Sequence, residues 1–332
     1  MIATELFARG FERALCAVAP RNVCRLVRDS DLFEGQSYSL DAFHDACEPY
    51  FERPYDFFGS FGRLQGLREV REVSADYRQF IFASPLTSGW ECNDTVPFKW
   101  FRGRCSSGTV LLLAPGWARV DQQLEEAVCR RMARSGVDMV LPTVPFHHAR
   151  RPPGSTNGEY FISHNVLLTV AGFRQFVAEI RQLVRYMRQS YDHVGLIGLS
   201  SGGFQTGLAS LGEAVDFLFP VMTGCELGKI TWSSLLTRRI RAALEAAGLN
   251  EPALSKAWAI ADMAVVGKHS RARYCKQYLT RYDGIVPLPY QQRLWEVHGR
   301  PESLVLEASH YSIIFSLKRI ARDIVSVVHQ RS

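Results

Sequence analysis

Ser200 is the residue of this chain whose surroundings most directly indicate covalent chemistry. It stands at the centre of Gly-Leu-Ser-Ser-Gly, residues 198–202. The apolar run before it predicts a short buried strand over 194–197, and the residues after it predict a helix that includes 204–208. Ser200 therefore falls on the sharp turn between a strand and a helix.

The glycines around Ser200 have a physical reason. The backbone is strained at such a turn, and Gly198 and Gly202 lack the Cβ atom that would keep the neighbouring chain segments apart. The turn raises the Ser200 hydroxyl clear of the sheet edge, and the pattern is that of a nucleophile elbow. The spacing of the two glycines favours Ser200 as the nucleophile over the adjacent Ser201.

A serine nucleophile needs a base that takes its proton and an acid that orients the base. Asp283 follows a predicted strand and precedes a glycine turn, and His310 follows a second predicted strand that begins near Ser303. The carboxyl ends of parallel strands lie at one edge of a sheet. We therefore expect Ser200, Asp283 and His310 to meet at that edge as a catalytic triad.

The chain resembles the α/β-hydrolase superfamily in its G-x-S-x-G elbow and in the order Ser200, Asp283, His310 along the sequence. The likeness covers roughly residues 76–330, and the segments around Asp283 and His310 are similar to the acid and base regions of esterase and peptidase-like branches. The likeness is greatest to mostly bacterial hydrolases with an N-terminal extension. It implies an α/β fold with a mostly parallel central sheet flanked by helices. Residues 1–75 are then an N-terminal extension packed on the core, and residues 225–268 are a helical cap or lid insertion.

The same resemblance implies an oxyanion hole built from backbone amides. One donor is the N–H after the nucleophile, here that of Ser201, and the second comes from the loop after the third strand. The apolar run 109–114 followed by Pro115 and Gly116 fits that loop, although many relatives carry His-Gly at this place. Because proline has no N–H, we expect Gly116 or Trp117 to supply the second donor.

The remaining periodicity predicts the elements that position these residues. Antiparallel strands are expected over 78–85 and 96–102, and further strands over 139–144 and 217–221. Helices are expected over 119–134 and 166–186.

The loop that follows residue 144 is long, basic and rich in proline, as substrate-binding loops often are. His147 and His148 have no nearby carboxylates at metal-ligand spacing, so we predict no metal site. Arg150 and Arg151 are interpreted as part of a solvated basic face, with contact to an anionic substrate group as the alternative.

Two further regions suggest packing rather than chemistry. The aromatic cluster over 50–58 is expected to pack on the core, with partial cover of the active-site mouth as the alternative. Trp232 and Trp258 are expected to pack inside the cap, with lining of the substrate pocket as the alternative. An apolar stripe at the N-terminus favours core packing or an oligomer contact over a membrane surface, and its members are Leu6, Phe7, Phe11 and Leu15.

Composition places the chain among ordinary globular proteins. Of 332 residues 47% are hydrophobic and 22% charged, and the net charge of +6 is spread out, which argues against nucleic-acid binding. The eight cysteines show no zinc spacing and predict reduced thiols. We find neither a signal peptide nor a membrane span in the sequence, and we expect a cytoplasmic protein.

These observations predict a serine hydrolase that cleaves an ester, a thioester or a related acyl bond of a small-molecule substrate. No metal or organic cofactor is required for that chemistry. An acyltransferase on the same scaffold is the first alternative, because only the acceptor of the acyl group differs. The second is a binding protein with a retired site, although such a protein is expected to have lost one of the three triad residues.

Overall fold

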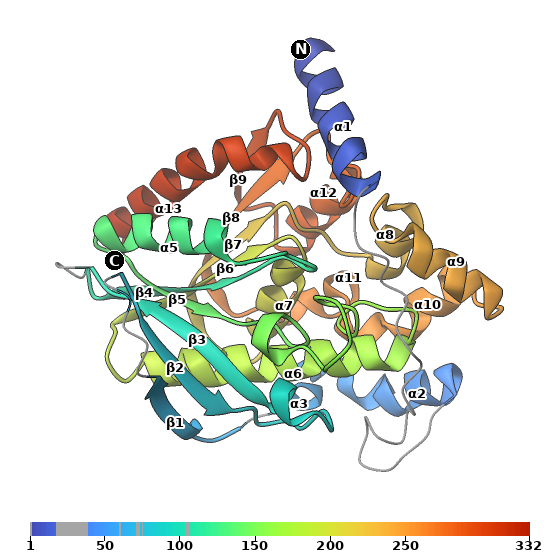
Figure 1. Ribbon diagram of the computed structural model, residues 1–332, viewed down its shortest axis with the longest axis horizontal. Coiled ribbons are helices and arrows are strands. Elements are labelled where there is room, and N and C mark those ends of the chain that lie inside the picture. Colours follow the sequence, from blue (N-terminus) through green and yellow to red (C-terminus); the bar gives the residue numbers. More distant parts are fainter. Residues whose placement is uncertain (1, 18–38, 60, 71–73, 75, 104–106) are drawn as a thin grey trace.

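The computed structural model describes residues 2–17, 39–59, 61–70, 74, 76–103 and 107–332. Within them, one sheet of nine strands runs through the molecule in the order β1-β2-β3-β5-β4-β6-β7-β8-β9 (Figure 1). The strands are β1 (Gln65–Val70), β2 (Arg78–Ala83), β3 (Thr95–Phe101), β4 (Thr109–Ala114), β5 (Asp138–Pro142), β6 (His193–Leu199), β7 (Val215–Val221), β8 (Ala272–Thr280) and β9 (Glu302–Leu306).

The sheet is antiparallel at one end and parallel over the rest. The pairs β1–β2, β2–β3 and β3–β5 are antiparallel, whereas every pair from β5 through β4 and β6 to β9 is parallel. The predicted antiparallel opening and the mostly parallel sheet are therefore confirmed. The parallel strands bring the ends of β6, β8 and β9 to one edge, where Ser200, Asp283 and His310 follow them.

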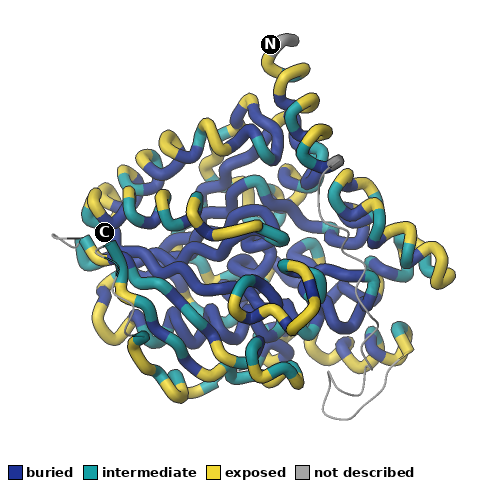
Figure 2. Tube along the Cα trace, viewed as in Figure 1, coloured by how far each residue is buried: buried dark blue, intermediate teal, exposed yellow. Residues whose placement is uncertain are grey.

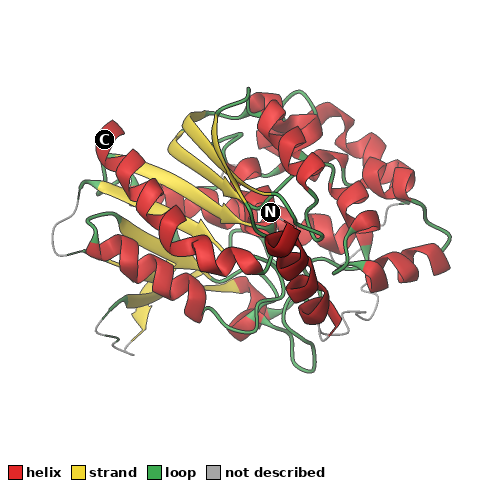
Figure 3. Ribbon diagram, turned by 90° about the horizontal axis from the view of Figure 1, so that it is seen from above, coloured by secondary structure: helices red, strands yellow, loops and turns green. Residues whose placement is uncertain are grey.

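Helices cover both faces of the sheet (Figure 3). The central strand β4 is buried along its whole length, with Val110 and Leu112 in the core on one face and Leu111 and Leu113 in the core on the other. Two helices, α6 (Val166–Met187) and α7 (Ser201–Ala209), line the first core, and two others, α5 (Gln123–Arg134) and α13 (Leu317–Arg331), line the second. Burial is accordingly greatest along the sheet and the inner helix faces (Figure 2).

One helix begins later than the sequence predicts. We expected a helix over 119–134, but α5 begins at Gln123. Ala118 has φ of 56°, and its N–H donates to Nε2 of His147, so this segment is a turn held by a neighbouring loop. The helix can start only after that turn, where Asp121 accepts a hydrogen bond from Gln123 N.

The region 225–268 is helical and packs beside α6 and α7. It contains α8 (Leu227–Ser233), α9 (Arg238–Ala246), α10 (Glu251–Ala257) and α11 (Met263–Val266). Trp258 is completely buried and donates its indole N–H to Val166 O at 2.9 Å, so its role is packing. The last helix before the final strand is α12 (Leu288–Val297), which starts directly after Pro287.

The first 75 residues contribute both helices and a strand. They form α1 (Ile2–Ala17), α2 (Leu40–Cys47) and α3 (Pro54–Phe57), and β1 pairs with β2 at the edge of the sheet. In the aromatic cluster, Phe57 and Phe58 are buried and contact each other edge to face. The prediction of packing for this cluster is therefore confirmed.

The apolar stripe of α1 is not fully packed into the core, and the oligomer contact that was the other expectation for it stays a prediction. Leu6 and Phe7 are 67% and 58% exposed, and the buried face of the helix is instead formed by Ala8, Glu12 and Cys16. These three residues are spaced four apart and therefore share one side of the helix. A buried glutamate on this face indicates that polar contacts help to fix the orientation of α1.

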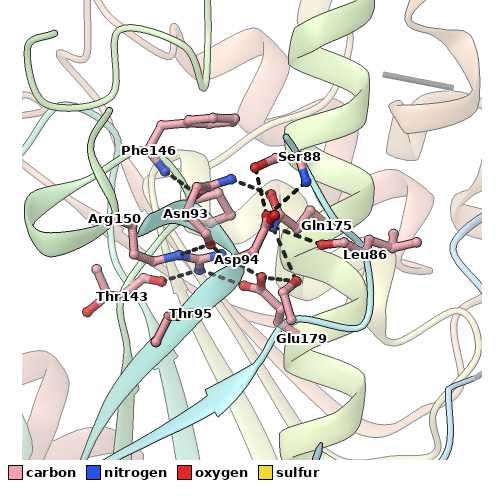
Figure 4. A network of polar contacts seen from close by, with 12 residues as sticks. Leu86, Ser88, Asn93, Asp94, Thr95, Thr143, Phe146, Arg150, Gln175 and Glu179 are labelled. Carbon is pink, nitrogen blue, oxygen red and sulfur yellow. Dashed lines mark hydrogen bonds and ion pairs between the residues drawn. The ribbon is translucent and has the colours of Figure 1, made fainter. Parts of the chain in front are cut away.

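A buried polar network fixes the loop between β5 and α6 (Figure 4). Arg150 is 0% exposed, and its guanidinium forms an ion pair with Glu179 of α6 at 2.6 Å. It also donates to the carbonyls of Asn93 and Thr143, so all five of its N–H donors have acceptors. The interpretation of Arg150 as an exposed basic or substrate-binding residue is wrong, because it carries the charge that neutralises a buried carboxylate.

This ion pair generates a stability prediction. Arg150→Met leaves Glu179 buried without its counterion and is expected to lower the free energy of unfolding by about 3–5 kcal/mol. The double variant Arg150→Met/Glu179→Leu should lose less than the sum of the two single variants, since no unpaired charge remains. Urea unfolding measures the free energy of unfolding of each variant. The control is Arg151→Met at the exposed neighbouring position, which should change that free energy by less than about 0.5 kcal/mol. A strictly additive double variant would contradict the ion-pair account.

Candidate active site

Ser200 has the strained backbone of a nucleophile elbow. It stands between β6 and α7 with φ of 52° and ψ of −119°, a conformation that residues with a side chain rarely adopt. Its N–H donates to Val221 O at the end of β7, and Gly203 N donates back to Ser200 O. The turn is thus held from both sides.

The glycines near Ser200 are required by close approach. A Cβ placed on Gly198 would lie 2.4 Å from Cα of Gly203, and one on Gly202 would lie 2.1 Å from the carbonyl oxygen of Ala114. Backbone atoms cannot tolerate such distances. The structure therefore places both predicted glycines where the turn, the helix and β4 touch.

Asp283 and His310 meet as expected at the edge of the sheet. His310 Nδ1 lies 2.9 Å from Asp283 Oδ2, and both side chains are buried. The other carboxylate oxygen accepts the N–H groups of Ile285 and Val286, which fixes the carboxylate in its turn. Since a carboxylate only accepts, the His310 Nδ1 must carry the proton and Nε2 is left to face the cavity.

Gln291, which the sequence analysis did not select, supports the acid. This residue of α12 is completely buried, and its amide nitrogen donates to Thr280 Oγ1 and to Val286 O. Thr280 in turn donates its hydroxyl to Asp283 Oδ2 at 2.8 Å. The acid is therefore oriented by the end of β8 and by the helix that follows it.

The electrostatics of His310 favour its protonated form. Burial alone would lower the pKa of His310, but the charge of the Asp283 carboxylate and its hydrogen bond outweigh burial and raise it above 6.5. The carboxylate of Glu12 adds to this effect.

The loop that carries the expected oxyanion donors is held by two neighbours. Trp117 donates its indole N–H to Gly158 O at 2.7 Å, and Ala118 N donates to His147 Nε2 at 3.0 Å. His147 Nδ1 faces Pro145 O at 2.8 Å, which requires the proton on Nδ1 and leaves Nε2 as the acceptor. Burial lowers the pKa of His147 to about 3, so the ring stays neutral in this role.

Backbone amides at this loop and at the elbow remain available to a ligand. In the part of the chain that the structure describes, no residue accepts a hydrogen bond from the N–H of Gly116 or Trp117. Ser201 is the first residue of α7, where the N–H has no acceptor within the helix. Gly116 also lies against Ser200, since a Cβ added to it would be 3.4 Å from Cβ of the serine. That the three amides form an oxyanion hole stays a prediction.

These groups surround one apolar cavity with a volume of about 100 Å³ that is open to the centres of water molecules. Its lining includes the candidate catalytic and oxyanion residues, namely Ser200, Ser201, Gly116, Trp117 and His310. The rest of the lining is mostly apolar and includes Leu124, Ile162, Phe204, Leu227, Ile230, Ile285 and Leu317. The region 225–268 thus contributes to this lining, whereas no described residue of 1–75 does.

The structure brings the three predicted triad residues together, but only one of the two hydrogen bonds of a triad is formed among them. Asp283 and His310 are hydrogen-bonded, but the described residues include no hydrogen bond between Ser200 and His310. Such bonds are often long in unliganded enzymes and tighten when a substrate is bound.

Two features that would indicate other classes of protein are missing from the described residues. None of their helices is long and apolar enough to span a membrane. None of their His, Cys, Asp and Glu side chains gather in a group of three or more that could hold a metal ion.

Solved structures resemble this chain over most of its length. An acetyl xylan esterase from Paenibacillus sp. R4 matches with a TM-score of 0.60 and 13% identity, over 92% of this chain and 97% of that chain. Acetyl xylan esterase 1 from Thermoanaerobacterium sp. JW/SL YS485 matches with a TM-score of 0.55 and 13% identity, over 82% and 92%. The acylaminoacyl peptidase of Pyrococcus horikoshii matches with a TM-score of 0.54 and 15% identity, over 77% of this chain and 41% of that chain.

These likenesses identify the architecture: the chain has the α/β-hydrolase fold, as predicted. No protein-family model matches the sequence. An uncharacterized protein of Mycobacterium tuberculosis, Rv2627c, is 37% identical over 83 residues, which is 24% of this chain and 20% of that protein. The uncharacterized protein YdjC of Bacillus subtilis is 26% identical over 100 residues, 30% of this chain and 86% of that protein. The match thus spans about a fifth of the length of the mycobacterial relative.

The environments of His310 and His147 predict that their pKa values shift in opposite directions. His310 is expected to titrate above pH 6.5, whereas His147 should stay neutral throughout pH 5–9, because Asp283 stabilises one charged ring and burial excludes the other. Nitrogen NMR of the imidazoles measures both, and Asp283→Asn should lower the pKa of His310 while leaving His147 unaffected. A His310 that titrates below 6.5 in the native protein would show that burial dominates.

Proposed function

We propose that this protein is a serine hydrolase that cleaves carboxylic esters or thioesters with an apolar acyl group. The observation that carries the proposal is a serine with φ of 52° that shares an apolar cavity with a histidine bonded to a buried aspartate. A strained backbone persists only where the surrounding structure supports it, and such strain is concentrated at functional sites. The similarity in fold to esterases and to a peptidase supports a hydrolase in general.

The arrangement suits acyl transfer through a covalent intermediate. Ser200 Oγ attacks the carbonyl carbon and passes its proton to His310 Nε2, while Asp283 stabilises the imidazolium. The amides of Ser201 and of Gly116 or Trp117 donate to the oxyanion. When the bond to the leaving group breaks, His310 returns the proton to the leaving oxygen or sulfur. Water, deprotonated by the same histidine, then releases the acid and restores Ser200.

The cavity favours an apolar group on the acyl side. Its lining combines aliphatic and aromatic side chains with few charged ones, namely Arg119, Glu125 and His310. Arg119 and Glu125 already pair at 3.0 Å, so neither charge is unbalanced. Burial of methylene groups against such walls stabilises a bound acyl chain by about 0.8 kcal/mol for each group.

An acyltransferase is the second candidate. It would use the same Ser200, Asp283 and His310, with an alcohol or amine in place of water. The apolar cavity is compatible with that alternative, because a dry site protects an acyl-enzyme from hydrolysis. Product analysis with and without an added alcohol separates the two, since transfer yields a new ester and hydrolysis yields the free acid.

Labelling with a fluorophosphonate probe tests the nucleophile. Wild type should be labelled covalently, and Ser200→Ala should abolish labelling because the reacting oxygen is gone. Ser201→Ala is the matched variant: it removes the neighbouring hydroxyl but keeps the backbone N–H, so labelling should persist. Mass spectrometry of the intact protein detects the covalent adduct of the probe as an increase in mass.

Other labelling results would change the proposal. Loss of label on Ser201→Ala alone would move the nucleophile by one residue. No label on a well-folded wild type would contradict the hydrolase and favour the binding protein with a retired site.

The cavity also predicts a chain-length preference. Ile230→Trp fills part of the apolar lining and should lower kcat/KM for hexanoyl esters at least tenfold relative to acetyl esters, since only the longer chain needs that space. The comparison uses p-nitrophenyl esters of increasing length. Val265→Trp, on an exposed part of α11, is the control with no expected change. An equal loss for both esters would place the acyl chain elsewhere.

A further inference from the structure

Glu12 is the one acidic residue of α1 that points into the protein. It is 2% exposed, although the helix around it carries several exposed side chains. Figure 1 shows α1 at the outside of the fold, with its C-terminal end directed toward the rest of the molecule. Burial of an ionisable side chain is costly unless hydrogen bonds compensate for the lost water, so its partners are informative.

Both oxygens of this carboxylate bind backbone amides of the loops that carry the acid and the base. Oε2 accepts the N–H of Gly284, next to Asp283, at 2.8 Å. Oε1 accepts the N–H of His310 itself, also at 2.8 Å. Glu12 thus joins the loop after β8 to the loop after β9 through one side chain.

The contact between Glu12 and Gly284 requires a residue without a side chain at position 284. A Cβ added to it would lie 2.6 Å from Glu12 Oε2, well inside van der Waals contact. Its φ is not in the left-handed region, so the glycine is not needed there for backbone freedom. The missing side chain provides the space in which the carboxylate reaches the amide.

We infer that Glu12 is a positioning residue of the proposed hydrolase, whose carboxylate holds the acid loop and the base loop at the distance that the Asp283–His310 pair requires. The inference rests on the proposed function for its catalytic consequence. The bridge from Glu12 to Gly284 and His310, called here the Glu12 bridge, is independent of it.

The bridge requires the ionised form of Glu12. A carboxylate has two oxygens that only accept, whereas a carboxylic acid turns one of them into a donor, which opposes a backbone N–H. Burial raises the pKa of Glu12 to about 7, and the nearby Asp283 charge adds to the effect. The bridge is therefore complete above pH 7 and weakened below it.

Ionisable groups surround this carboxylate from three segments. They are Arg9, Arg13 and Cys16 on α1 itself, Arg281 and Asp283 after β8, and His310 and Tyr311 after β9. The pKa of His310 is also raised, so its titration contributes to any pH profile of the site. The contribution of Glu12 must therefore be isolated by substitution rather than read from one pH profile.

The sign of the linked stability follows from these pKa values. The unfolded chain loses the Glu12 proton near pH 4.5, but the folded protein keeps it until about pH 7. Folding stability therefore falls as pH rises through this interval, by on the order of 50-fold in the unfolding equilibrium constant between pH 5 and pH 8. His310, with its raised pKa, also loses its stabilising contribution as pH rises through its folded value, so part of the fall remains without Glu12.

The test is the full-length Glu12→Gln variant. Gln keeps the size but offers one acceptor and one donor, so one of the two amides loses its bond. We expect kcat to fall at least tenfold with KM changed less than threefold, because the acid and base are displaced while the cavity is intact. The change in the unfolding equilibrium constant between pH 5 and pH 8 should become smaller by the factor of about 50 that Glu12 contributes. Glu5→Gln, which changes a partly exposed glutamate of α1 that pairs with Arg9, should match wild type in both measurements.

Gly284→Ala provides an independent second variant, since its methyl group displaces the Glu12 carboxylate without altering it. It should reproduce the loss in kcat, and the double variant Glu12→Gln/Gly284→Ala should be no worse than Glu12→Gln alone. Wild-type kcat in Glu12→Gln, or fully additive losses in the double variant, would overturn the inference. So would an unchanged pH dependence of stability, which is measured by unfolding and stays informative even if wild type proves to have no esterase activity.

Discussion

The backbone of Ser200 imposes a constraint on which the rest of the site depends. Its conformation costs about 1–3 kcal/mol for a residue with a Cβ, and it persists because neighbouring elements leave no alternative. The end of β7 accepts its N–H, and α7 starts so close to β4 that only glycine fits at Gly202. The arrangement of β4, β6, β7 and α7 is therefore a condition for presenting one hydroxyl at the sheet edge.

Separate groups support the two sides of that hydroxyl. On one side, Gln291 and Thr280 orient Asp283, which in turn orients His310. On the other side, a neutral His147 holds the turn that carries the oxyanion candidates. The loop of His147 is itself anchored by the buried Arg150–Glu179 pair, as Figure 4 shows for the network around Asn93. Asp283, Arg150 and Glu179 thus lie outside the cavity lining, which is mostly apolar.

The fold and the approximate place of the candidate triad were predictable because their signals are local. The continuous apolar run of β4 and the glycines around Ser200 each lie within a dozen residues of sequence. By contrast, β1 was missed because it is an edge strand whose residues are mostly exposed and partly charged, so no buried alternation marks it.

The supporting residues were missed for another reason. Glu12 has the sequence context of an exposed helix residue, and Arg150 stands in a basic pair that is typical of a solvated surface. Their partners lie 298 and 29 residues away. Burial of a charge is decided by such distant partners, and one sequence offers no pattern from which to infer them.

The contact between Glu12 and His310 also has a consequence for how the protein is made. The ribosome adds Glu12 298 residues before it adds His310. The elbow, the central sheet and the cavity wall can fold while synthesis continues, because domains generally fold as the chain emerges. The N–H of His310 in the base loop can donate to Glu12 of α1 only when residue 310 has emerged. A nascent chain that ends before residue 310 therefore cannot complete the Glu12 bridge or the Asp283–His310 pair.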